Sequence, residues 1–161
     1  MPVQKLCLWF DGQAEQAAQY YTTIFPNSAV TAVGRNHDGS VLMVEWTLDG
    51  QPYQGLNGGP MFTFTEAISI SISCADQAEV DHFWDALREG GEESQCGWLR
   101  DRFGLWWQVI PSRLPELLGD PDPERAQRAM QAMLGMRRIV VAELEAAAAG
   151  TATAPVGVTA P

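Results

Sequence analysis

The chain has 161 residues, of which 46% are hydrophobic, and its formal net charge is −10 at pH 7. This length and composition suit one globular domain with a true hydrophobic core. The acidic balance argues against nucleic acid and anionic membranes as partners, because both repel a negatively charged protein.

The cysteine pattern points to a reduced, cytoplasmic protein. Cys7, Cys74 and Cys96 are widely spaced and form no Cys-x-x-Cys pair. A zinc knuckle is therefore excluded, and a disulfide framework is disfavoured. No apolar run reaches membrane-spanning length, and no signal peptide is visible at the N-terminus. We therefore predict a cytoplasmic location with free thiols and no membrane partner.

The first half of the chain predicts a strand, a helix and three further strands. Apolar residues at helical spacing mark residues 13–25 as a helix, which Pro26-Asn27 ends. Turn residues at 36–39 and Asp49-Gly50 are typical of hairpin tips. The expected strands are 5–10, 28–34, 41–48 and 51–56.

The second half repeats this order. Residues 67–74 alternate strictly between small or apolar residues and serine, which is the clearest strand signal of the chain. Asp76 and Glu79 form a capping box that opens a helix ending at Gly90-Gly91. Residues 90–111 then predict strands joined by a tight turn at 101–104. The triplet Gln-Ala-Glu opens both helices at an offset of 64 residues, which favours a duplicated βαβββ module.

A helical extension is expected after the second module. Residues 112–118 predict a short helix, and Asp122-Pro123-Glu124 caps a long helix running to Ala147. The long helix has an apolar face that must be buried, so we predict that it packs on the sheet or forms a homodimer contact. The expected segments of the single globular domain are 1–60, 61–111, 112–148 and a flexible tail at 149–161.

Five motifs between residues 4 and 111 resemble those of a known family. They are Leu8–Gly12 (LWFDG), Ala17–Tyr21 (AAQYY), Leu56–Pro60 (LNGGP), Gly90–Trp98 (GGEESQCGW) and Asp101–Gln108 (DxFGxxWQ). The chain resembles the PhnB-like branch of the vicinal oxygen chelate superfamily, which includes glyoxalases, bleomycin resistance proteins and dioxygenases. The resemblance implies an α+β fold in which two βαβββ modules form curled mixed sheets around a cleft, followed by C-terminal helices.

Members of this branch often carry the name 3-demethylubiquinone-9 3-methyltransferase, but the residues do not support that activity. A methyltransferase needs a glycine-rich turn after its first strand to approach the cofactor. Here the turn after the first strand contains only Asp11-Gly12.

The resemblance also implies where a metal would bind, and the residues at those positions are poor ligands. In metal-dependent relatives, two histidines or glutamates of each half hold a divalent metal in the cleft. The equivalent positions here are Lys5, Gln54, Ser69 and Gln108. Lysine must lose a proton to bind a metal, and amides are weak neutral donors. We therefore predict no cofactor, with Glu66 as the one weak candidate for a divalent-metal ligand.

Strand alternation and the resemblance together predict the lining of the cleft. We expect Ile70, Ile72 and Cys74 to pack on the second helix, and the serines between them to face the cleft. The predicted ligand-binding residues are Lys5, Cys7, Trp9, Gln54, Asn57, Ser69, Ser71, Cys96, Trp106 and Gln108.

Several of these residues have plainer interpretations. His37 lies at a hairpin tip and His82 on a helix, so both are expected at the surface. Cys96 needs a nearby cation or base to become reactive, and a buried small residue is the simpler interpretation. Trp9 and Trp106 can be plain core or can stack on a planar ligand.

Three functions remain open from sequence alone. The first is a protein that binds a small polar or planar molecule without a metal, and the missing ligands favour it. The second is a metal-dependent enzyme of the glyoxalase or dioxygenase type. The third is a dimeric interaction protein with a vestigial cleft. Whether any reaction is catalysed, and on what substrate, stays undecided.

Overall fold

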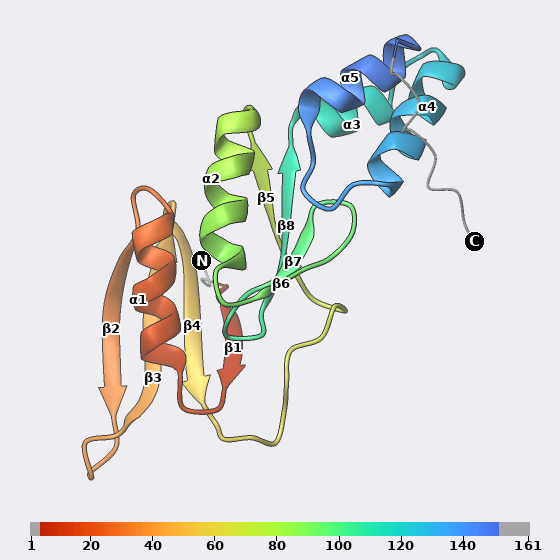
Figure 1. Ribbon diagram of the computed structural model, residues 1–161. Helices are drawn as coiled ribbons and strands as arrows, with labels where there is room; N and C mark the ends of the chain where they lie inside the picture. The colour runs from red at the N-terminus through yellow and green to blue at the C-terminus, as the bar shows by residue number, and fades with distance from the viewer. Residues whose placement is uncertain (1–3, 152–161) are drawn as a thin grey trace. The chain divides into compact units, whose positions relative to one another are not determined.

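The computed structural model describes residues 4–151, which divide into two compact units (Figure 1). The first unit contains the chain up to Ile68 together with Phe103–Leu105. The second unit contains Ser69–Arg102 and the chain from Trp106 onward. The ring of Phe103 lies 5.9 Å from the rings of Tyr20 and Tyr21, which explains its place in the first unit.

The first unit is a four-stranded mixed sheet with one helix against it (Figure 1). The strand order is β1-β4-β3-β2, in which β1 runs parallel to β4 and the other neighbours are antiparallel. Its elements are β1 (Leu6–Phe10), α1 (Ala14–Ile24), β2 (Ala29–Arg35), β3 (Val41–Leu48) and β4 (Gln51–Asn57).

The second unit repeats this topology. Its strand order is β5-β8-β7-β6, with β5 parallel to β8, so each strand has a counterpart in the first sheet. The predicted duplication of a βαβββ module is therefore confirmed. Its sheet and first helix comprise β5 (Ile70–Cys74), α2 (Gln77–Arg88), β6 (Glu92–Glu93), β7 (Trp98–Arg100) and β8 (Trp106–Pro111). The strand predicted from residue 67 begins only at Ile70, because residues 66 and 67 form a turn.

Alternation along the strands separates two faces of each sheet. In β3, Val44, Trp46 and Leu48 are buried and pack on the α1 side. In β5, Ile72 and Cys74 are buried whereas Ser71 and Ser73 are exposed, as the sequence predicts. We call the face opposite α1 or α2 the open face of each unit. It carries every second residue of β1, β3 and β4 in the first unit, and of β5, β7 and β8 in the second.

Turns and caps follow the sequence signals. Asp49 and Gly50 both have positive φ angles, 44° and 79°, which is the geometry of a type I′ turn between two antiparallel strands. The Asp76 side chain accepts a hydrogen bond from the Glu79 backbone N–H at 3.0 Å, which confirms the capping residue of α2. The Asp122 carboxylate likewise accepts from the Glu124 N–H at 2.9 Å and opens α4 (Pro123–Leu134).

Asn57 fastens α1 to the sheet of the first unit. Its Oδ1 accepts a hydrogen bond from the Ala14 N–H at 2.9 Å, at the start of α1. Its Nδ2 donates to the Val41 carbonyl at 3.0 Å, at the start of β3. Since Gln13 makes no side-chain cap, Asn57 supplies the acceptor that the helix start requires.

Replacing Asn57 with alanine is expected to destabilise the fold by about 1–3 kcal/mol, because two backbone groups lose their partners. An aspartate at this position keeps the acceptor and adds a favourable charge at the helix start, so it should recover part of the loss. Urea unfolding of both variants measures this. Equal stability of wild type and Asn57→Ala would contradict the fastening role.

The long helix predicted from Pro123 to Ala147 is wrong, because the structure breaks it into two helices. After α3 (Arg113–Leu118), α4 ends at Leu134, and α5 (Val141–Ala149) begins after a non-helical segment. Carbonyl groups in that segment serve other partners: Met136 O and Arg137 O accept hydrogen bonds from the Cys96 and Gly97 N–H groups, both at 2.7 Å. Glycine at position 135 and the β-branched pair at 139–140 also lower the helix preference there.

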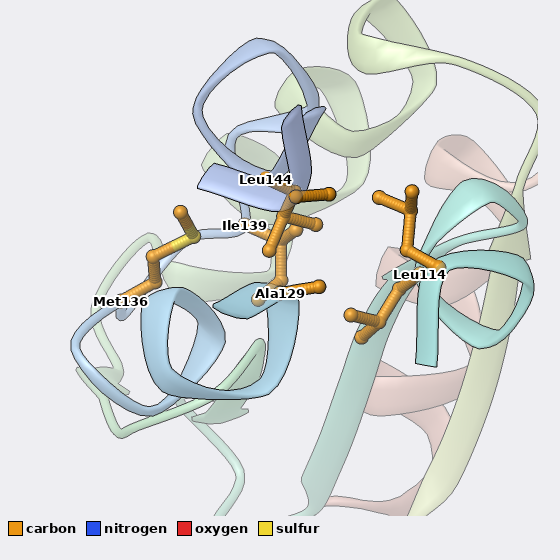
Figure 2. Close-up of a cluster of buried hydrophobic side chains, with 7 residues drawn as sticks. Leu114, Ala129, Met136, Ile139 and Leu144 are labelled. Atoms are coloured by element: carbon orange, nitrogen blue, oxygen red, sulfur yellow. The ribbon is translucent and has the colours of Figure 1, made fainter. Parts of the chain in front are cut away.

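The break lets the extension bury its own apolar core. Met136 and Ile139, from the non-helical segment, join side chains of α3, α4 and α5 (Figure 2). Ile110 at the end of β8 packs against this cluster, so the extension is continuous with the second unit. The cluster consists of Leu114, Leu117, Ala129, Met136, Ile139, Leu144 and Ala148.

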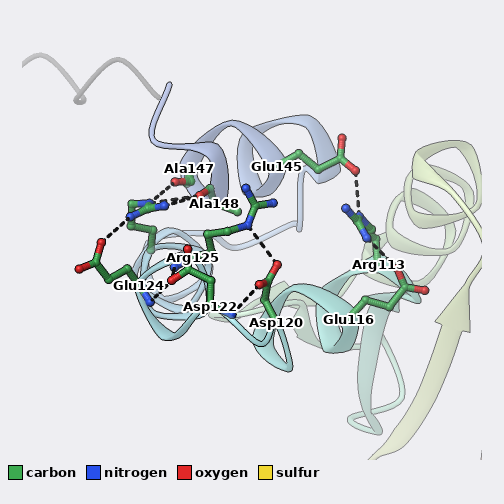
Figure 3. Close-up of polar contacts among 10 residues, drawn as sticks. Arg113, Glu116, Asp120, Asp122, Glu124, Arg125, Glu145, Ala147 and Ala148 are labelled. Atoms are coloured by element: carbon green, nitrogen blue, oxygen red, sulfur yellow. Dashed lines mark hydrogen bonds and ion pairs between the residues drawn. The ribbon is translucent and has the colours of Figure 1, made fainter.

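Arginine side chains add polar links within the extension (Figure 3). Arg113 pairs with Glu145 at 2.9 Å and with Glu116 at 2.8 Å. The Arg128 guanidinium donates to the Ala148 carbonyl at 2.7 Å and so caps the C-terminal end of α5. Solvent-exposed ion pairs contribute little stability, so the apolar cluster carries most of the packing energy here.

None of the described helices is long and apolar enough to cross a membrane. The predicted flexible tail at 149–161 lies largely outside the described residues, which end at Thr151.

Candidate ligand-binding faces

The open face of the first unit carries a row of polar side chains across three strands. Cys7 of β1 pairs with Gln54 of β4, and Gln54 pairs with Glu45 of β3. Each of these residues alternates with neighbours on the α1 side, such as Leu8 and Trp46, which are buried. Cys7 is exposed, whereas Gln54 and Glu45 are half-buried. The structure thus brings the predicted residues Cys7 and Gln54 together and adds Glu45.

Lys5 and Glu45 form an ion pair on this face. The Lys5 Nζ lies 2.8 Å from Glu45 Oε2, and the two side chains are 30% and 34% exposed. The sequence prediction missed Glu45, although alternation in the strand 41–48 could have found it. Val44 and Trp46 face α1, so Glu45 between them must face the opposite side.

Trp9 lies near the end of β1 and packs on the loop that follows β4. Its indole N–H donates to the Gly59 carbonyl at 2.8 Å, and its ring meets Phe62 edge-on at 5.0 Å. A Cβ on Gly58 would lie 2.2 Å from Trp9 Cζ2, so only glycine lets the ring pack this closely. Trp9 is therefore half-buried and fixed in orientation.

Asn57 does not share the open face. It alternates with Leu56 and, like Gly55, lies on the α1 side, where both ends of its amide bond backbone groups. Strand alternation from Gln54, which lies on the open face, puts residue 57 on the opposite face, so β4 does not place this predicted residue beside Gln54.

The open face of the second unit is built around Gln108. Its Nε2 donates a hydrogen bond to Ser69 Oγ at 2.8 Å. In β5 and β7, the residues paired with Gln108 are Ser71 and Trp98. Gln108 and Trp106 are half-buried and share this face, whereas Trp107 between them is fully buried on the α2 side. The predicted directions of these side chains in β8 are therefore confirmed.

The two open faces are equivalent in register. Cys7 pairs with Gln54 in the first sheet as Ser71 pairs with Gln108 in the second. The 64-residue offset of the duplicated module holds from Cys7 to Ser71, whereas Gln54 and Gln108 are 54 residues apart because the second module is shorter between these strands.

Trp107 is a structural residue of the second unit. Its indole N–H donates to Asp101 Oδ2 at 2.8 Å, and both side chains are buried. Asp101 is the buried polar group that stabilises the turn between β7 and β8, because it accepts a donor that would otherwise lack a partner.

Cys96 occupies the turn before β7. Its backbone has a positive φ angle of 58°, and its N–H donates to the Met136 carbonyl at 2.7 Å. This hydrogen bond holds the segment between α4 and α5 against the turn. The backbone of Cys96 thus has a structural role, which sequence alone did not indicate.

The remaining candidates lie at the surface of the units. Glu66 is exposed in the turn before β5, and His37 is exposed at the hairpin tip between β2 and β3. His82 is exposed on α2, with its ring edge-on to Phe83 at 5.0 Å. Among residues 4–151, no group of three or more His, Cys, Asp or Glu side chains is placed to hold a metal ion.

Cys74 differs from the other two thiols in its burial. Burial, together with the negative charges of Glu79 and Asp76, raises the pKa of the Cys74 thiol to about 12. Cys7, by contrast, is exposed.

We expect iodoacetamide to modify Cys7 in the native protein at pH 8 and to leave Cys74 unmodified, with mass spectrometry as the readout. At that pH almost all Cys74 stays in the unreactive thiol form. Because the folded-state pKa is raised, stability should fall as pH rises from about 9 toward about 12, where only the unfolded thiol ionises. A Cys74→Ser variant should show less of this alkaline loss. Rapid native modification of Cys74 would contradict its burial.

The two units have the βαβββ order that the resemblance to the vicinal oxygen chelate superfamily implies. Residues 4–110 match the family model described as 3-demethylubiquinone-9 3-methyltransferase. The chain therefore belongs to this family, the PhnB-like branch of the vicinal oxygen chelate superfamily.

Several solved structures are similar to this chain. The PhnB protein of Bacillus cereus is 27% identical, with a TM-score of 0.65, over 69% of this chain and 100% of that one. Protein PA1353 of Pseudomonas aeruginosa is 18% identical, with a TM-score of 0.59, over 69% of this chain and 98% of that one. The fosfomycin resistance protein FosX of Listeria monocytogenes is 14% identical, with a TM-score of 0.49, over 66% of this chain and 89% of that one. A comparison with curated proteins found no match.

Proposed function

We propose that this protein binds a small polar or planar molecule on the open faces of its modules, without a metal. The observation that carries the proposal is the Gln108–Ser69 pair. The Gln108 Nε2 is already engaged with Ser69 Oγ at 2.8 Å. Its Oε1 has no hydrogen-bond partner among the described residues, so a half-buried acceptor remains available to a ligand donor.

The neighbouring side chains suit a planar polar molecule. Trp106 lies two residues before Gln108 on the same face and is half-buried. Its ring offers a surface on which a flat ligand can stack, while Gln108 and Ser71 supply polar contacts at the edge.

The residues at the family's metal positions do not fit a divalent cation. In the first unit Lys5 is a cation already paired with Glu45, and Gln54 is a neutral amide. In the second unit Ser69 accepts the hydrogen bond of Gln108, so both are engaged with each other. Neither pair supplies the anionic or imidazole donors that divalent metals prefer. We therefore infer binding without a metal.

The methyltransferase name of the family is not part of the proposal. β1 is followed by Asp11-Gly12 and then by α1, without the glycine-rich turn that a nucleotide-like cofactor needs at this point.

Mass spectrometry of small molecules released from the purified, denatured protein tests the proposed function. Wild type should release a small molecule at a stoichiometric level, and Gln108→Leu should release much less. Gln16→Leu is the matched control, because Gln16 is exposed on α1, on the side of the first sheet opposite its open face. No ligand from wild type, or equal amounts from wild type and Gln108→Leu, would count against the proposal.

A homodimer also remains part of the proposal. Met130 and Leu134 on α4 are 39% and 52% exposed, so this helix leaves apolar surface uncovered. We expect light scattering at micromolar concentration to give twice the chain mass of 17.6 kDa. A double change to glutamate at these two positions should shift the mass toward the monomer. A monomeric wild type would contradict the dimer.

A further inference from the structure

Lys5 is the only lysine in the chain, and it lies on the open face of the first unit. Between residues 4 and 68 the only other cationic side chain is Arg35, which pairs with Glu15 of α1 at 3.2 Å. Among the described residues, Lys5 is therefore the one positive charge on the open face of the first unit, in an acidic protein.

The ammonium group of Lys5 has N–H donors that make no hydrogen bond to a described residue. Within the described part of the chain its one polar contact is Glu45 Oε2 at 2.8 Å, which uses one of three N–H donors. Gln54, on the strand between β1 and β3, makes no side-chain hydrogen bond to any described residue although it is half-buried. The polar row of Lys5, Gln54 and Glu45 on the open face therefore has N–H donors on Lys5 and an amide on Gln54 that are not engaged in hydrogen bonds.

Fold stability does not account for this pair. Each partner is about one third exposed, and an ion pair of that exposure contributes about 0–1 kcal/mol. The pair does, however, hold the ammonium at Glu45, whose partner in the strand register is Gln54, and so at a defined place on the sheet. Such preorganisation lowers the entropy cost of binding a charged group.

We propose that this row binds a small organic carboxylate with a hydrogen-bond donor on the adjacent carbon. The carboxylate accepts from the free N–H groups of Lys5, and the neighbouring hydroxyl or amine donates to Glu45 or to Gln54 Oε1. This inference rests on the proposed function, because it names the ligand class for the open face of the first unit. Glu45 competes with the ligand for Lys5 and therefore limits the affinity.

Acetylation of the sole lysine provides the test. Sodium glycolate carries the carboxylate and the adjacent hydroxyl, glycolamide lacks the charge, and acetate lacks the donor. The rate at which N-hydroxysuccinimidyl acetate modifies Lys5 is read by mass spectrometry, with the α-amino group as the internal control. We expect glycolate to slow Lys5 modification saturably at millimolar concentration, acetate to do so more weakly, and glycolamide not at all.

The Glu45→Gln variant separates ligand binding from a purely structural pair. Removal of the competing carboxylate should lower the glycolate concentration for half protection by about two- to fivefold. A structural pair predicts no glycolate protection in either protein, and thermal unfolding verifies that the variant is folded. Equal slowing of both amines, or no slowing by glycolate, would overturn the inference. If a molecule still co-purifies in a Gln108-dependent way, only this inference fails and the proposed function stands.

Discussion

Replacing Gly91 with alanine is expected to destabilise the protein by about 3 kcal/mol or more, the upper range for overpacking. A Cβ at this position would lie 2.1 Å from the Arg100 carbonyl oxygen and 2.9 Å from the Asp101 Cα. These are backbone atoms of β7 and its turn, so no side chain can move aside. Differential scanning calorimetry should show a melting temperature lower by about 6–12 °C for a chain of this size.

Gly34→Ala is the matched control. Gly34 lies in β2, has no positive φ angle, and a Cβ there would meet Met43 O only at 3.6 Å. We expect its stability to stay close to that of wild type. A Gly91→Ala protein as stable as the control would show that β6 and β7 can separate without cost.

Replacing Gln108 with leucine is expected to weaken ligand binding by about 1–3 kcal/mol, or about five- to 150-fold. The ligand donor that meets Gln108 Oε1 would lose its partner, and the hydrogen bond to Ser69 Oγ would be lost as well. The fold should survive, because the two side chains have similar volumes. Equilibrium dialysis with the co-purified molecule measures the affinity, and urea unfolding measures the stability.

Gln16→Leu makes the same chemical change at an exposed position and should alter neither quantity. Unchanged affinity together with a large loss of stability in Gln108→Leu would make Gln108 a structural support.

Local patterns were sufficient to predict the fold of the two modules. Alternation in residues 67–74 correctly separated the buried Ile72 and Cys74 from the exposed Ser71. The Asp49-Gly50 dipeptide predicted a hairpin, and both residues have the positive φ angles that its turn requires. Such signals depend on a few neighbouring residues, so sequence alone contains them.

Features that depend on distant partners were missed. The sequence pattern predicts one continuous helix from Pro123 to Ala147. In the structure, however, the N–H groups of Cys96 and Gly97 donate hydrogen bonds to the carbonyls of residues 136 and 137, and Ile139 is buried in the apolar cluster. Tertiary contacts here override a pattern that is otherwise helical. No local signal indicates that a turn 40 residues earlier supplies these partners.

The candidate site was predicted unevenly for the same reason. Strand alternation correctly placed Gln108 beside Ser69 and on the face opposite Trp107. The Lys5–Glu45 ion pair was missed, because it joins the residue before β1 to β3, and these two strands are not adjacent in the sheet. Asn57 was predicted as a cleft residue, yet its side chain fastens α1, because Asn57 is three residues from Gln54 in β4 and therefore faces the opposite side.

Ligand binding by protein that has been stripped of metal tests the central claim most directly. Purified wild type is treated with a chelator, its metal content is measured, and its affinity for the co-purified molecule is determined by equilibrium dialysis. Binding without a metal predicts the same affinity before and after stripping, and no gain on adding Mn²⁺, Zn²⁺, Ni²⁺ or Fe²⁺. Loss of binding on stripping, with recovery when one of these cations is restored, would contradict the account.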